Sequence, residues 1–231
     1  MAASAIAIAC NAEAAAIGRP AGYTHGLRSV LGESAWERLP VAVRARFADP
    51  QGETDYVGEF EVVRASLLGS LIARACRLIG TPLAPRTGRH VPAIVRVGPR
   101  GAGVEWRREY RWSDRSSCIV RSTKVIETDG TLVEKLPARL CMALHVYEQG
   151  GILHFVSHRY YFEHALLRRG ASTKVVLPRW LTPGTTHVEH QDQSDGWFRF
   201  TMTVTHPLFG ELFYQSGRFR AKEAECLPYM H

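Results

Sequence analysis

The sequence predicts a mainly β (α+β) domain, built as a curved antiparallel sheet or incomplete β-barrel covered by one long helix. From Pro92 onward, apolar and polar residues alternate with a period of two, as in a half-buried strand. The dipeptides Asp129-Gly130, Gly150-Gly151 and Asp195-Gly196 separate several alternating segments and are typical of tight hairpin turns. Short strands joined by hairpins indicate an antiparallel meander rather than βαβ units.

Ten segments have the length and alternation of strands. They are residues 56–63, 93–98, 104–112, 118–128, 131–136, 139–148, 152–162, 187–191, 197–205 and 211–219. In residues 104–112, Trp106 and Tyr110 share a face with Arg108, while charged residues occupy the other face. We expect the aromatic face to point inward, where Arg108 would need a partner because burying an unpaired charge is costly.

Helical patterns precede these strands. Ser34 and Glu37 fit a capping box, and residues 41–47 continue as a short helix after Pro40. Residues 64–79 form the long helix, whose leucine and isoleucine positions share one face. We expect this helix to cover the apolar side of the sheet.

One domain is predicted over residues 34–231, with an internal pocket. Residues 1–33 are predicted to form a flexible, alanine-rich tail. Their apolar part has no preceding lysine or arginine, unlike an export signal. The chain has no run of 18 apolar residues, so we expect no membrane span and a cytoplasmic protein.

Charge and cysteine content narrow the function classes. The net charge of +7 comes mainly from scattered arginines, and the densest group of them is interleaved with acidic residues. Nucleic-acid binding favours a concentrated basic face, so we expect no nucleic-acid partner. The five cysteines are widely spaced without a CxxC pair, which argues against a disulfide framework or a cysteine zinc site.

A group of histidines follows the strand pattern around Gly150-Gly151. If the hairpin closes through Gln149 and Gly150, His145 lies opposite His154 with Cβ atoms about 5 Å apart. That pair could share a proton or bind a metal, although no third ligand is evident. A turn on Gly150-Gly151 would instead put Tyr147 opposite His154. A structural role on a polar outer face is the other interpretation of these histidines.

The candidate catalytic residues are His154, His158 and Tyr160, which would share one face of strand 152–162 as proton donors or acceptors. The candidate ligand-binding residues are His145, Arg108, Trp106, Tyr110 and His206. His206 precedes Pro207, so it can either cap a tight turn or act as a base at the pocket mouth. His187, Glu189 and His190 indicate a solvated edge, because His190 faces away from the other two. No cofactor is predicted, and a metal is considered only through His145 and His154.

Several segments resemble a bacterial domain-of-unknown-function family. They are HPLFGELFYQSGRF at residues 206–219, LPVAVRARF at residues 39–47, YVG at residues 56–58, and the GGIL hairpin at residues 150–153. The resemblance covers about residues 36–220 and implies no transferable catalytic motif. Members occur alone or behind saccharopine-dehydrogenase-like modules, which implies a partner dehydrogenase. The glycine-rich residues 98–103 precede a strand and indicate a hairpin rather than a dinucleotide loop.

Together these patterns predict a pocket for a small apolar or amphiphilic molecule, with cofactor-independent acid/base catalysis of the isomerase, cyclase or hydrolase type. A lipid or metabolite carrier without catalysis is the first alternative, and the sequence is compatible with a homodimer. An interaction domain for a partner dehydrogenase is the second. That role would show an exposed apolar patch and no enclosed cavity.

Overall fold

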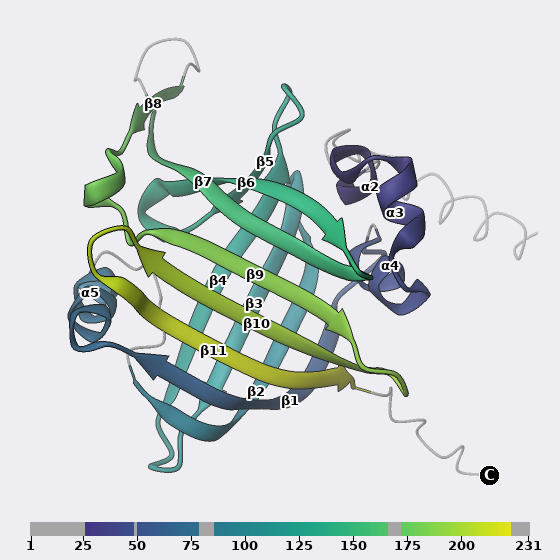
Figure 1. The fold of residues 1–231 in the computed structure, drawn as a ribbon, viewed down its shortest axis with the longest axis horizontal. Helices are drawn as coiled ribbons and strands as arrows, with labels where there is room; N and C mark the ends of the chain where they lie inside the picture. Colours follow the sequence, from purple (N-terminus) through teal and green to yellow (C-terminus); the bar gives the residue numbers. More distant parts are fainter. Residues whose placement is uncertain (1–25, 49, 79–85, 166–171, 223–231) are drawn as a thin grey trace, which may run out of the picture.

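The computed structural model describes residues 26–48, 50–78, 86–165 and 172–222, and shows a closed antiparallel β-barrel (Figure 1). The barrel strands are β1 (Thr54–Ala65), β2 (Gly88–Arg100), β3 (Gly103–Arg111), β4 (Ser117–Ile126), β5 (Leu132–Lys135), β6 (Leu140–Gln149), β7 (Ile152–Ala165), β9 (Thr185–Asp192), β10 (Trp197–His206) and β11 (Gly210–Ala221). Each overlaps one of the ten predicted strands. The mainly β class and the antiparallel arrangement are therefore confirmed.

Two long-range pairings close the sheet. The strand order is β6-β5-β4-β3-β2-β1-β11-β10-β9-β7, and β7 pairs back to β6. β1 pairs with β11 at the other end of the chain, and the N-terminal half of β7 pairs with β9. The predicted incomplete barrel is thus replaced by a closed one, in which each of these ten strands has a neighbouring strand on both sides.

β7 has two neighbours along one edge. Leu153 to Val156 pair with β9, whereas Tyr161 to Ala165 pair with β8 (Ser172–Val176), a short strand outside the barrel order. On its other edge Ala143 pairs with Arg159 and Leu144 pairs with Ser157, so His158 is the extra residue of a β-bulge. A single extra residue reverses which face the following side chains occupy.

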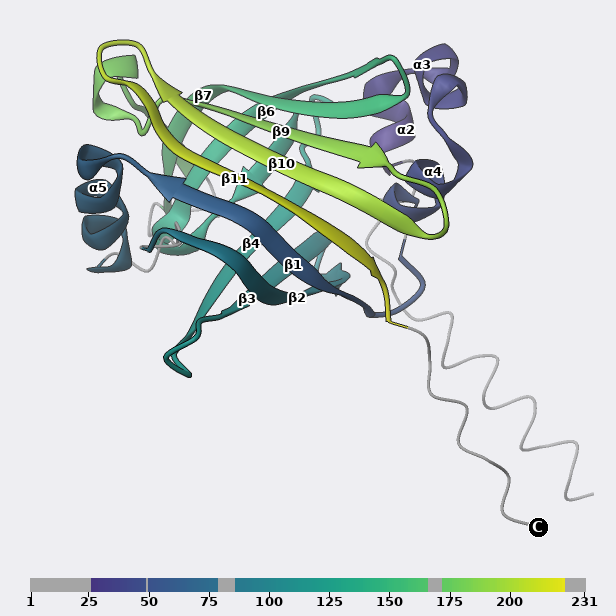
Figure 2. The same ribbon diagram turned by 60° about the horizontal axis from the view of Figure 1, so that its bottom comes forward.

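The helices lie at the two ends of the barrel (Figure 2). α2 (Gly26–Leu31), α3 (Glu33–Arg38) and α4 (Val41–Phe47) gather at one end, and α5 (Leu67–Leu78) lies at the other. From α4, Val43 and Phe47 enter the core at 0% and 5% exposure. None of the helices in the described part of the chain is long and apolar enough to cross a membrane.

The described residues do not show a single long helix that covers the sheet, and the longest of their α-helices, α5, has 12 residues. Residues 64 and 65 belong to β1, so the helix predicted from residue 64 begins at Leu67, while residue 79 lies outside the described residues. Leu67 and Leu71 of α5 are 90% and 60% exposed, so part of its apolar face lies against no sheet. The helix is anchored at its start, where Ser66 N–H donates to the Leu212 carbonyl of β11 (2.9 Å).

The helices at the N-terminal end of the described chain differ from the predicted ones. α2 begins before Ser34, and its Leu27 is 1% exposed within the core. α3 begins at Glu33 without a side-chain cap, so the predicted capping box at Ser34 and Glu37 is not formed. The remainder of the predicted tail, residues 1–25, lies outside the described residues.

Candidate functional site

The barrel encloses three charged side chains from adjacent strands. Arg108 of β3, Lys124 of β4 and Glu134 of β5 are 9%, 5% and 6% exposed. They share the inner face because each alternates with outward residues along its strand. Lys124 stands directly opposite Glu134, with 3.3 Å between Nζ and Oε2. Two cations and one anion leave this group with an excess positive charge.

The surroundings of these charges lower the pKa of both Glu134 and Lys124. Burial alone would raise the pKa of Glu134, but the charges of Lys124 and Arg108 and a hydrogen bond from Ser122 outweigh it and lower that pKa. Burial lowers the pKa of Lys124, against the opposing attraction of Glu134. Lys124 also lies over the ring of Trp106, 5.3 Å from its centroid.

A cavity of about 90 Å³ lies beside this group. Its polar lining includes Arg108, Ser122, Glu134, Tyr160, Thr186 and Gln215. Its apolar lining includes Val120, Leu136, Leu140, Met142, Met202 and Phe213. We call this space the barrel cavity. An apolar chamber with a few converging polar groups is the usual form of a small-molecule site.

Most polar groups of the cavity wall are already paired. The Tyr110 hydroxyl donates to Gln215 Oε1 (2.9 Å), and burial raises the pKa of Tyr110 to about 12. The Tyr160 hydroxyl is hydrogen-bonded to Thr186 Oγ1 (2.9 Å). Arg108 differs: within the described residues its guanidinium makes one hydrogen bond, a long one of 3.5 Å to Ser122 Oγ. A guanidinium has five N–H donors, so Arg108 retains donors for a ligand in the cavity.

A second space lies on the outside of the barrel, next to the point where β7 leaves β9. This groove of about 460 Å³ is bordered by His158, Arg159, Arg179 and Thr185. Tyr160 borders both the groove and the barrel cavity. The Tyr160–Thr186 hydrogen bond therefore stands between the outer groove and the interior.

The structure divides the sequence-predicted site residues between two faces. Trp106, Arg108, Tyr110 and Tyr160 are at most 9% exposed and face inward. His206 is also buried, but its Nδ1 accepts the Leu208 N–H (3.2 Å) and its ring stacks on Phe209. This geometry corresponds to the turn-capping alternative for His206.

The expected interior cluster of histidines is wrong. Leu153 and Phe155 belong to the core, so the alternating His154 faces outward, as does the exposed His145 on β6. The turn forms on Gly150-Gly151, so Tyr147 and not His145 stands opposite His154, and the proposed His145–His154 metal pair does not form. His158 and Tyr160 were expected to share one face of the strand, but the bulge at His158 puts them on opposite faces. Tyr160 points inward, while His158 is exposed at the groove.

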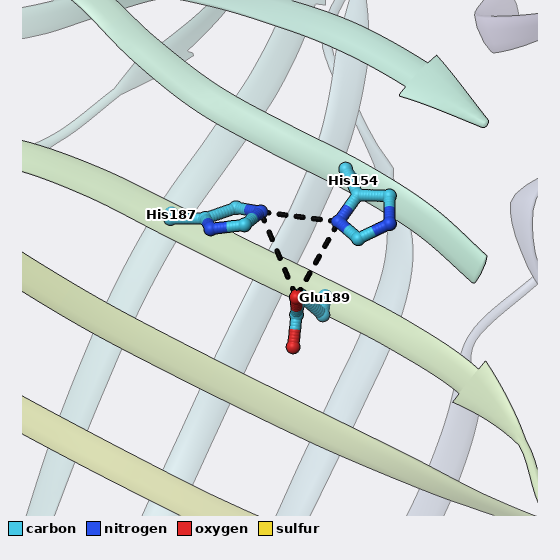
Figure 3. Close-up of side chains that lie close together, drawn as sticks. All are labelled: His154, His187 and Glu189. Carbon is cyan, nitrogen blue, oxygen red and sulfur yellow. Dashed lines mark hydrogen bonds and ion pairs between the residues drawn. The ribbon is translucent and has the colours of Figure 1, made fainter. Parts of the chain in front are cut away.

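Outside the barrel, His154 meets two residues of β9 (Figure 3). His154 Nδ1 lies 3.0 Å from His187 Nε2 and 3.5 Å from Glu189 Oε1, and 3.8 Å separates the latter two atoms. Within the described residues, this is the one group of three or more His, Cys, Asp or Glu side chains with metal-binding proximity. We call these residues the outer triad.

The comparison with protein families decides the classification. The model of the family described as "Domain of unknown function (DUF4166)" matches residues 39–219. The chain belongs to this DUF4166 family. No curated protein and no solved structure matched the chain. The expected membership in a family of unknown function is confirmed, and the family description assigns no chemistry to the DUF4166 barrel.

Two parts of the DUF4166 site were missed from sequence. The Lys124–Glu134 pair could have been predicted, because these opposite charges flank the predicted Asp129-Gly130 turn. An antiparallel hairpin at that turn places them opposite each other. The outer triad could not have been predicted in this way, because β7 and β9 pair across more than thirty residues of chain that include β8. Within one strand, His187 and Glu189 indicated only a solvated edge.

Proposed function

We propose that the DUF4166 barrel binds a small amphiphilic molecule, with an anionic group at Arg108 and an apolar part in the barrel cavity. The spare donors of the buried Arg108 carry this proposal. Hydrogen bonds to a charged group contribute about 1.5–3 kcal/mol, roughly double a neutral hydrogen bond. An anion would also balance the excess positive charge of Arg108, Lys124 and Glu134.

The dimensions favour a slender ligand. A cavity of about 90 Å³ is smaller than the roughly 300–1,000 Å³ of drug-sized pockets, so a bulky ring system does not fit without rearrangement. A chain could run from Arg108 past Met142 and Met202, whose flexible side chains adapt to different occupants. A longer tail would pass Tyr160 into the outer groove.

The end of the barrel near the groove is suited to receive such a molecule. α5, the short helix η2 (Arg179–Leu181) and the β10–β11 turn lie at the same end (Figure 1). Each exposes a large apolar side chain: Leu67 at 90%, Trp180 at 65% and Phe209 at 58%. These residues would shield the apolar part of a ligand as it leaves water.

The interior geometry favours binding over the acid/base chemistry expected from sequence. His154 and His145 face away from the barrel cavity, so neither contacts a ligand held there. Tyr160 does border the cavity, but burial raises its pKa, so it stays protonated and acts as a hydrogen-bonding group. The interaction-domain alternative receives less support, because that role predicts a barrel without an enclosed cavity and the barrel has one.

The test compares octanoate with octan-1-ol by isothermal titration calorimetry. We expect the wild-type protein to bind octanoate at least tenfold more tightly than the alcohol, about 1.4 kcal/mol in binding free energy. Arg108→Met should remove that preference. Arg107→Met, on the outward face of the same strand, should retain it, and circular dichroism would confirm that both variants fold. Failure of the wild-type protein to bind octanoate, or an equal loss in both variants, would refute the proposal.

A further inference from the structure

We propose that the outer triad, His154, His187 and Glu189, is a divalent zinc site with one coordination position open to solvent. The site lies on the outer face of the β7–β9 pair and is independent of ligand binding in the barrel cavity.

The register of the two strands places the three donors together. His154 of β7 stands directly opposite Glu189 of β9, and His187 lies two residues before Glu189 on the same strand. Side chains two residues apart on a strand share a face, so all three project to the same side. Figure 3 shows the two rings and the carboxylate pointing toward one another.

The separations between donor atoms fit a metal. The three distances of 3.0, 3.5 and 3.8 Å leave a point about 2 Å from all three atoms, which is the usual zinc bond length to imidazole nitrogen and carboxylate oxygen. The edges of a tetrahedral zinc site are about 3.3–3.4 Å, within the same range. A small displacement of the metal from the plane of the donors would leave room for a fourth ligand.

Hydrogen bonding alone explains less of this geometry. A proton shared between His154 and His187 accounts for their 3.0 Å contact. The Glu189 oxygen, however, lies 3.5 and 3.8 Å from the two nitrogens, outside the range of a charge-assisted hydrogen bond. A carboxylate held only by hydrogen bonds would approach one ring more closely.

Surrounding residues hold the first ligand in position. The ring of His154 stacks on Tyr147 with centroids 4.7 Å apart and planes 9° apart. The same ring forms a hydrogen bond with the backbone of Gln149. Metal-binding histidines commonly have such a second partner, which fixes the ring and its tautomer.

The donor set and exposure indicate the metal class. Two imidazoles and one carboxylate suit zinc, as in catalytic zinc sites that hold a water in the fourth position. The side chains of His187 and Glu189 are 35% and 37% exposed, so that position would be open to water or a small ligand. Calcium and magnesium prefer oxygen ligands throughout and are disfavoured here.

The test uses the full chain, stripped with EDTA, desalted and titrated with Zn²⁺ against a chromophoric chelator. We expect one zinc per chain with a dissociation constant of micromolar or lower. His187→Ala and Glu189→Gln should weaken binding at least tenfold, with the larger loss for the histidine. His145→Ala is the matched control, because this exposed histidine lies on the neighbouring β6 outside the triad. The zinc affinity of this variant should equal that of the wild-type protein.

Cobalt provides a second readout for the same proteins. Co²⁺ bound by the wild-type protein should give visible absorption bands of a four-coordinate nitrogen and oxygen site, and His187→Ala should lose them. The proposal is overturned if the wild-type chain binds less than one zinc at 100 µM. It is overturned equally if His145→Ala weakens binding as much as His187→Ala. Because His187 is partly exposed, this variant should fold even if a change at the more buried His154 does not.

Discussion

Glu134 is a buried carboxylate that partly offsets two buried cations, and its charge has consequences for the whole interior. Lys124 faces it from β4, Arg108 faces it from β3, and Tyr160 approaches from β7. Replacing Glu134 would leave two cations in a low-dielectric interior without an anion. Breaking a buried ion pair by removing one partner is far more costly than losing an exposed pair.

We therefore expect Glu134→Gln to lower the free energy of unfolding at pH 7 by about 3 kcal/mol. The pKa of Glu134 is lower in the folded chain than its ordinary value of 4.5. Its contribution is thus present above pH 4.5 and is lost as pH falls through the folded pKa. Urea unfolding from pH 7 to pH 3 should show a constant difference down to about pH 4.5, and below it the wild-type protein should approach the variant.

Glu163→Gln is the control for this measurement. Glu163 pairs with Lys135 on the outer face, where their side chains are 23% and 37% exposed. Its loss should cost less than about 1 kcal/mol. Equal destabilisation by the two substitutions would show that the interior charges are not balanced as described.

Among the elements, the β6–β7 hairpin determines which side chains reach the outer triad. Gly150 and Gly151 have φ values of +61° and +79°, so Gln149 pairs with Ile152 and Tyr147 pairs with His154. Such a turn requires residues that tolerate the left-handed region. Gly150 has open space around it, whereas Gly151 lies near Pro40.

Gly150→Asn should change the free energy of unfolding by less than about 0.5 kcal/mol, because asparagine tolerates positive φ. Gly151→Val should destabilise the protein by about 1–3 kcal/mol, since a β-branched residue is strained there. Urea unfolding of both variants measures the difference. Equal stability of the two variants would contradict the assigned turn.

The same hairpin shows which features of the fold can be predicted from the sequence and which cannot. Period-two alternation located all ten barrel strands and put Trp106, Arg108 and Tyr110 on an inward face, because these signals are local. Alternation does not predict which face of a strand points into the barrel when both faces of that strand carry aromatic residues or histidines. For β7 the answer depends on the turn at Gly150 and the bulge at His158, and a one-residue change at either reverses the faces.

At the level of the whole molecule, barrel closure depends on pairings that no local pattern specifies. β1 meets β11 and β7 meets β9, so residues distant in sequence form both the cavity wall and the outer triad. A hairpin-by-hairpin meander predicts a sheet with two edges. The closed barrel follows only when the ends of that sheet can pair, which is a property of its total twist and strand number.

Closure also creates a problem of access, because the barrel cavity is enclosed on its sides by strands. The wall is weakest where β7 passes from β9 to β8, and there Tyr160 separates the cavity from the outer groove. Its hydroxyl bonds to Thr186 and also accepts a hydrogen bond from Ser157 Oγ (3.3 Å). A ligand that enters through this wall must break these contacts.

Tyr160→Phe removes the hydroxyl but keeps the ring, and the loss of its shorter hydrogen bond, to Thr186, accounts for about 1 kcal/mol. We expect association and dissociation of octanoate, followed by the intrinsic tryptophan fluorescence of the protein, to accelerate about fivefold, while the dissociation constant changes less than about twofold. A gate contributes equally to both rates because it affects the barrier and not the bound state. Stopped-flow fluorescence measures both rates directly.

Tyr161→Phe is the matched control, since that neighbouring hydroxyl donates to Glu127 on the outer face and does not border the cavity. Its rates should equal those of the wild-type protein. Unchanged rates in Tyr160→Phe would place the access route elsewhere, with the α5 end as the next candidate. A weaker affinity with unchanged association would instead make the Tyr160 hydroxyl a direct ligand contact. The kinetics therefore distinguish a gate from a binding residue at the one side chain that borders both spaces.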